Sequence, residues 1–79
     1  MTIITFDDVT QINNILRQKG LPCKVVVYER PEGQECHFDY PRDWGFDRLI
    51  VAVNEVECFF RRINKPIQFS GNGRTFRRV

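Results

Sequence analysis

The chain has 79 residues, of which 42% are hydrophobic and 28% charged, and its formal net charge is +2. This length predicts one domain over residues 1–79, and so large an apolar fraction excludes a disordered chain. The longest apolar run, residues 49–53, is far shorter than the roughly 20 residues that span a bilayer. The N-terminus also lacks the basic and apolar regions of a signal peptide. We therefore expect a cytoplasmic protein without membrane contact.

The first predicted element is a helix over residues 7–19. Thr5 is a typical helix cap, and Asp7 and Asp8 follow in the first turn, where the helix dipole favours negative charge. Apolar residues then recur at helical spacing, at Val9, Ile12, Ile15 and Leu16. Gly20 and Pro22 mark the end of the helix. A short strand over residues 2–6 is expected to precede it.

Two segments rich in β-branched and aromatic residues, 23–30 and 36–40, predict a β-hairpin that turns at residues 31–33. If Glu32 and Gly33 form a two-residue turn, the register follows from it. That register pairs Val27 with Phe38, Val25 with Tyr40, and Arg30 with Glu35. A three-residue loop would instead turn the side chains of one strand over to the other face.

A second helix is predicted to begin at Asp43 or Asp47 and to end before Pro66. At about 100° per residue, eight apolar side chains fall within one arc of roughly 140°, which is typical of a helix that faces a core. They are Phe46, Leu49, Ala52, Val53, Val56, Phe59, Phe60 and Ile63. Ile50 and Val51 lie outside the arc, either as scattered surface residues or as part of a contact patch.

Residues 67–79 predict a second hairpin around Asn72-Gly73, a dipeptide typical of tight turns. Its register places Phe69 opposite Phe76 and Ser70 opposite Thr75. The predicted element order is (β)αββαββ. The expected fold is an α+β two-layer sandwich, in which two helices pack on one face of an antiparallel sheet.

The sequence offers little for metal binding or catalysis. Cys36 and His37 are neighbours in a predicted strand and so point to opposite faces. Structural zinc needs four ligands, whereas the chain has three scattered cysteines and one histidine. Cys23, Cys36 and Cys58 are therefore expected to be free, reduced and buried. Because so short a chain has little room for both a core and a lined cleft, neither a cofactor nor an enzymatic activity is expected.

Positive charge is concentrated in the C-terminal part of the sequence. Residues 1–57 carry six basic and ten acidic residues, a net charge of −4, whereas residues 58–79 carry six basic residues and no acid. Five of these six are arginine, which pairs bidentately with phosphate or carboxylate. The six are Arg61, Arg62, Lys65, Arg74, Arg77 and Arg78. The dipole of the second helix accounts for the first three, but not for the last three.

Trp44 lies in a turn-rich loop before the second helix. It either covers the core or is an exposed aromatic anchor of the kind that dominates protein interfaces. Together with the six basic residues, Trp44 makes up the predicted contact surface.

Short domains that are rich in acidic residues and arginine and lack a catalytic site resemble, in size and style, the small inhibitors that phages and mobile elements encode, anti-CRISPR proteins among them. This resemblance implies a non-catalytic binding protein that regulates or inhibits a larger protein or ribonucleoprotein partner.

Two alternatives remain open. The same arginines suit nucleic acid, although the pI near 8.6 is below the value of about 9 that is usual for such domains. Residues 35–40 are also acidic where the RNA-recognition motif is basic and aromatic. In addition, open edges of the predicted sheet would allow a homodimer, through either the 23–40 hairpin or the C-terminal hairpin.

Overall fold

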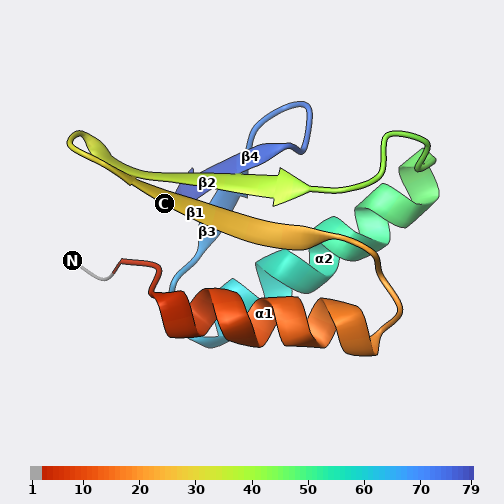
Figure 1. Ribbon diagram of the computed structural model, residues 1–79, viewed down its shortest axis with the longest axis horizontal. Helices are drawn as coiled ribbons and strands as arrows, with labels where there is room; N and C mark the ends of the chain where they lie inside the picture. Colours follow the sequence, from red (N-terminus) through yellow and green to blue (C-terminus); the bar gives the residue numbers. More distant parts are fainter. Residues whose placement is uncertain (1–2) are drawn as a thin grey trace.

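The computed structural model describes residues 3–79, which form an α+β fold of two layers (Figure 1). The elements in chain order are α1 (Phe6–Gln18), β1 (Lys24–Arg30), β2 (Gly33–Asp39), α2 (Phe46–Arg62), β3 (Ile67–Phe69) and β4 (Thr75–Arg78). The strands form one antiparallel sheet in the order β1-β2-β4-β3, and both helices cover the same face of it. The predicted fold is confirmed. Within residues 3–79, neither helix has the length and apolar character that a bilayer crossing requires.

The start of α1 is fixed by a reciprocal pair of hydrogen bonds. The Thr5 hydroxyl accepts from the Asp8 N–H at 3.1 Å, and the Asp8 carboxylate accepts from the Thr5 N–H at 2.9 Å. This capping box satisfies two N–H groups that a helix start otherwise leaves without partners. The predicted cap is confirmed, and the helix lies one residue earlier than expected. Gly20 follows the helix with a φ of 72°, which glycine adopts readily.

The strand expected over residues 2–6 is wrong for the residues described, 3–6. Residues 3–5 pair with no strand, and Phe6 already belongs to α1; Thr2 lies outside the described part of the chain. The Gln34 side chain takes the place of a neighbouring strand. Its carbonyl accepts from the Ile4 N–H at 3.0 Å, and its amide donates to the Ile4 carbonyl at 2.6 Å. Hydrogen bonds to a single side chain therefore hold this segment in place, whereas pairing with a neighbouring strand was expected.

The β1–β2 hairpin turns at Pro31 and Glu32, one residue earlier than predicted. Val25 consequently pairs with Phe38, Val27 with Cys36, and Arg30 with Gly33. The predicted register is wrong because it required a positive φ at Glu32, whereas Pro31 has the fixed negative φ that suits the first central position of a turn. Gly33 then takes a φ of 135°. Because the partners move by two positions, every side chain keeps its predicted face.

Helix α2 begins at Phe46 after Gly45, which has no side chain to cap it, so neither Asp43 nor Asp47 is the cap. The predicted apolar arc packs against the sheet, except that Phe46 is 74% exposed. This residue lies at the edge of the arc in the first turn. The helix ends at Arg62, before Asn64 adopts a left-handed φ of 62°. Ile50 and Val51 are exposed, in agreement with their place outside the arc.

The core lies between the helices and the inner face of the sheet. Its largest fully buried side chains are Phe38, Phe60, Ile4, Ile12, Leu16, Val25, Val56 and Cys36. The C-terminal hairpin closes it with the predicted register, since Phe69 pairs with Phe76 at a ring distance of 5.0 Å. The Ser70 N–H donates to the Thr75 carbonyl at 2.9 Å, which confirms the second predicted pair.

Candidate binding surface

The structure divides the six C-terminal basic residues among several places. Lys65 is tied to Asp8 by an ion pair that joins the end of α2 to the start of α1. The two side chains are only 15% and 12% exposed. Burial by itself raises the pKa of Asp8, but hydrogen bonds from Lys65 and from Thr5 outweigh it and hold this pKa below its ordinary value. Lys65 is therefore engaged within the fold, through its ion pair with Asp8.

The other basic residues point in different directions. Arg61 and Arg62 are exposed in the last turn of α2. Arg77 and Arg78 are neighbours on β4 and so lie on opposite faces of the sheet. Arg78 donates to the Pro66 carbonyl at 2.7 Å on the helix side. The six basic residues, which lie close together in the sequence, are thus separated in the structure. Neighbouring residues of a strand point to opposite faces, and the hairpin separates its basic residues from those of α2.

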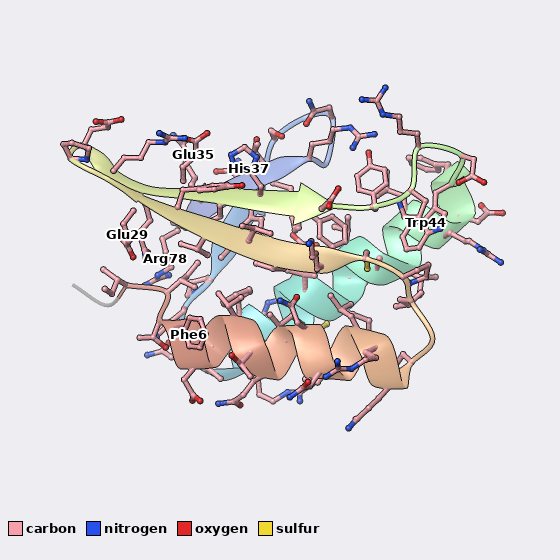
Figure 2. All side chains as sticks on the ribbon, viewed as in Figure 1. Phe6, Glu29, Glu35, His37, Trp44 and Arg78 are labelled. Carbon is pink, nitrogen blue, oxygen red and sulfur yellow. The ribbon has the colours of Figure 1, made fainter. Side chains whose placement is uncertain are left out.

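Arg74 and Trp44 do come together, because both contact one aromatic ring, that of Tyr40. The Arg74 guanidinium lies 4.3 Å from the centre of the Tyr40 ring. Trp44 stacks on the same ring, with centroids 6.0 Å apart and planes inclined by 23°. The Tyr40 hydroxyl donates to the Asn72 carbonyl at 3.2 Å and so anchors the ring to the β3–β4 loop. Figure 2 shows Trp44 and Arg78 at opposite ends of the molecule. We call Arg74, Tyr40 and Trp44 the Tyr40 stack.

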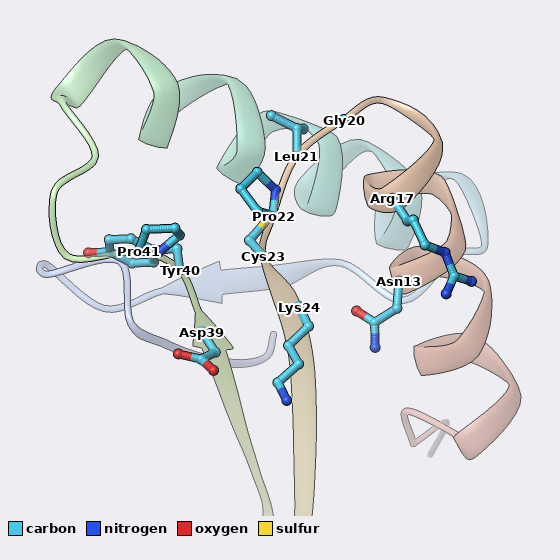
Figure 3. A pocket seen from close by; sticks show the side chains of 10 residues that line it. All are labelled: Asn13, Arg17, Gly20, Leu21, Pro22, Cys23, Lys24, Asp39, Tyr40 and Pro41. Carbon is cyan, nitrogen blue, oxygen red and sulfur yellow. The ribbon is translucent and has the colours of Figure 1, made fainter.

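A groove of about 790 Å³ adjoins the Tyr40 stack. Figure 3 shows Asn13 and Arg17 of α1 on one side of it, the end of β2 on the other, and the segment from Leu21 to Lys24 between them. Apolar lining comes from Leu21, Pro22, Cys23, Tyr40 and Pro41, and a charged rim from Arg17, Lys24 and Asp39. Two further hollows share lining residues with this groove. One, of about 360 Å³, is lined by Arg74, and the other, of about 480 Å³, is lined by Trp44.

Sequence reasoning missed Tyr40 and the two prolines at this end. The signal was present in the hairpin, because pairing Lys24 with Asp39 brings the preceding Pro22 and the following Pro41 to the same edge. The wrong register concealed this, since it placed Tyr40 opposite Val25 within the strands.

The three cysteines are free thiols, as expected. Burial raises the pKa of Cys23 to about 11, and burial together with the Glu29 charge raises that of Cys36 to about 11. Both thiols are therefore protonated at neutral pH, and Cys23 is a poor nucleophile in the groove wall. Of the three cysteines expected to be buried, Cys36 is buried, Cys23 is only partly buried and Cys58 is exposed, so the expectation is wrong for Cys58. Its position on α2 falls outside the arc that faces the core.

The face of the sheet away from the helices carries a cluster of polar and aromatic side chains, separate from the Tyr40 stack. Tyr28 and His37 meet edge to face with ring centroids 5.2 Å apart. Glu35 contacts His37 at 2.8 Å and forms an ion pair with Arg30. Hydrogen bonds from His37 and from Arg30 hold the pKa of Glu35 below its ordinary value. His37 lies on this face (Figure 2), whereas Cys36 is buried on the other, as predicted.

Within residues 3–79, no group of three or more histidine, cysteine, aspartate or glutamate side chains is arranged to hold a metal ion. Comparison with family models, curated proteins and solved structures finds no match to this chain.

Proposed function

We propose that the protein is a small non-catalytic binding protein that regulates or inhibits a larger macromolecular partner, in the manner of the inhibitors that phages encode. The Tyr40 stack with its adjoining groove carries this proposal. Aromatic and arginine side chains that are pre-positioned by packing are enriched among the residues that dominate binding energy. Here Trp44 and Arg74 are held on one ring, beside a groove with apolar walls.

The chemistry of the groove supports binding rather than catalysis. Its thiol, Cys23, is protonated at neutral pH. The side-chain amide of Asn13 is engaged with the Val25 backbone, at 2.7 and 3.0 Å. The remaining charged groups are at the rim and suit polar contacts around an apolar centre, which is the usual anatomy of a protein interface.

An affinity capture with paired charge reversals tests the proposal. Arg74→Glu and Arg62→Glu change the net charge equally, but only Arg74 belongs to the Tyr40 stack. We expect wild-type protein and Arg62→Glu to retain the same defined protein, and Arg74→Glu to lose it. Equal retention by both variants moves the interface elsewhere and removes the support for this proposal. Circular dichroism of each variant confirms that the fold is intact.

Nucleic-acid binding is the second candidate, and the open face of the sheet favours it. Tyr28 offers an exposed ring and His37 a partly exposed one for base stacking, and Arg30 lies 5.7 Å from the Tyr28 ring. Such binding would weaken steeply as salt is raised, because it releases counterions from phosphate. Fluorescence anisotropy with mixed single-stranded DNA and RNA at low salt tests it, and an absence of binding there removes this candidate.

A further inference from the structure

Strand β1 is an outer strand whose free edge is only partly covered. Its pairing with β2 leaves the backbone groups of Val25, Val27 and Glu29 directed away from the sheet. At Val25 both groups are bound by the Asn13 side chain, which accepts from the N–H at 2.7 Å and donates to the carbonyl at 3.0 Å. Within residues 3–79, the outward N–H and C=O groups of Val27 and Glu29 have no such partner.

An apolar groove of about 440 Å³ runs beside this free edge. Phe6 and Val9 line it from the start of α1, and Ile4 from the segment that precedes the helix. Phe6 is 88% exposed and lies at the same end of the molecule as Glu29 (Figure 2). An open edge next to the exposed Phe6 side chain offers both backbone hydrogen bonds and apolar burial to another strand. The other outer strand, β3, has only three residues and offers much less.

We propose that β1 of a second copy of this chain pairs antiparallel with β1, about a two-fold axis that passes between the Tyr28 residues of the two copies. In this register Val27 of each copy lies opposite Glu29 of the other. The N–H of each of these two residues then donates to the C=O of the other across the interface. The free backbone groups of Val27 and Glu29 in both copies thus all find partners. The inference does not rest on the proposed function, because it involves no residue of the Tyr40 stack.

The two adjacent symmetric registers are disfavoured by charge. An axis at Val27 places Lys24 opposite Arg30, and it also requires the Val25 groups that Asn13 already binds. An axis at Glu29 places the two Glu29 carboxylates directly opposite each other. Like charges directly opposite one another in a sheet are destabilising.

The register centred on Tyr28 is complementary along the whole edge. The two Tyr28 rings, each 48% exposed, meet on the open face. Lys24 of one copy approaches Glu32 of the other, which gives an attractive pair on each side of the axis. Pro31 falls opposite the covered Val25, and since proline has no N–H, no donor is left without a partner there. The combined sheet ends in the short β3 of each copy, so association closes at two chains.

Sedimentation equilibrium between about 1 µM and 1 mM tests the association, a range that covers weak interfaces. We expect the mass to rise from 9.4 kDa to twice that value. Tyr28→Lys places like charges at the axis and is expected to raise the dissociation constant about tenfold or more. Val51→Lys adds the same charge at an exposed position of α2, away from β1, and is expected to leave the dissociation constant unchanged. A monomer at every concentration, or a dimer that Tyr28→Lys leaves intact, overturns the proposal.

Cross-linking tests the register. Cα atoms of a directly opposed pair of this kind lie about 4.5 Å apart, within the range that a disulfide spans. In a background of Cys58→Ser, which removes the exposed thiol, Tyr28→Cys is expected to form a covalent dimer under mild oxidation. Val26→Cys is the control, because its two copies lie too far apart across the axis. Equal cross-linking of the two variants contradicts the register. If the chain stays monomeric and its β1 edge binds an unrelated extended peptide instead, the edge binds a different partner and the proposed dimer is wrong.

Discussion

Loss of the Asp8 carboxylate is expected to destabilise the fold strongly, because this group has two roles. It accepts from the Thr5 N–H in the capping box and it neutralises the Lys65 ammonium. Losing a helix cap costs about 1 kcal/mol, and removing one partner of a buried ion pair costs roughly 3–5 kcal/mol. Because the Lys65 side chain is still about 15% exposed to water, we take the lower end of the range for the ion pair and expect Asp8→Ala to lower the free energy of unfolding by about 4 kcal/mol in total. A domain of this size has only about 4–12 kcal/mol.

Urea denaturation followed by circular dichroism measures this loss. Asp7→Ala is the matched control, because Asp7 lies in the same helical turn but is exposed and, among residues 3–79, accepts only from Gln11. It is expected to cost about 0.5 kcal/mol or less. A double-mutant cycle of Asp8→Ala with Lys65→Met isolates the pair, and its coupling energy should exceed about 1 kcal/mol. A loss no larger than that of Asp7→Ala refutes the reasoning.

The pH dependence provides a second check on Asp8. Its pKa is lowered in the folded state, so the stability it contributes is fully present above the ordinary value of 3.8 and is lost as the pH falls through the lowered folded value. The difference in unfolding free energy between wild type and Asp8→Ala should therefore diminish towards about pH 2. A difference that stays constant with pH would mean that the carboxylate charge is not involved.

Two further predictions concern the thiols and the first hairpin. Of the three cysteines, only Cys58 is exposed, and the pKa values of Cys23 and Cys36 are raised. A thiol reagent at neutral pH should therefore label Cys58 rapidly, and Cys23 and Cys36 only after denaturation. Rapid labelling of all three cysteines in the folded state would contradict this prediction. Gly33→Ala forces a side chain into a φ of 135° and should cost about 1–3 kcal/mol in thermal or urea denaturation. Gly71→Ala, which introduces no contact and no such φ, should be close to neutral.

Local signals in the sequence were sufficient for most of the fold. The Thr5 cap, the arc of α2 and the register of the C-terminal hairpin were found as expected. The turn of that hairpin is centred on Gly71 and Asn72, one residue earlier than the predicted Asn72-Gly73, because the Gly73 N–H donates to the Ser70 carbonyl. The predicted register of the first hairpin was wrong because Pro31 and Gly33 both favour turns, so that either Pro31-Glu32 or Glu32-Gly33 could form the turn. The choice between the two turns depends on the φ that Glu32 must adopt.

The candidate site was harder to predict, because it depends on residues that are far apart in the sequence. Charge counted along the chain brings Lys65 and Arg74 into one block, whereas the fold pairs Lys65 with Asp8 and places Arg74 on Tyr40. Ion pairs with distant acids and the alternation of strand faces are not visible in a linear count. The link between Trp44 and Arg74 required the Tyr40 ring, which the predicted register had placed elsewhere.

The Asn13 amide imitates one residue of a neighbouring strand, and this has a consequence for solubility. It shortens the length of β1 that can template the addition of further chains. Asn13→Ala would release the Val25 groups and lengthen the exposed template by one residue that hydrogen-bonds outwards. A single side chain thus limits how far this hairpin can seed fibrillar aggregates, a hazard common to small proteins with unprotected strands.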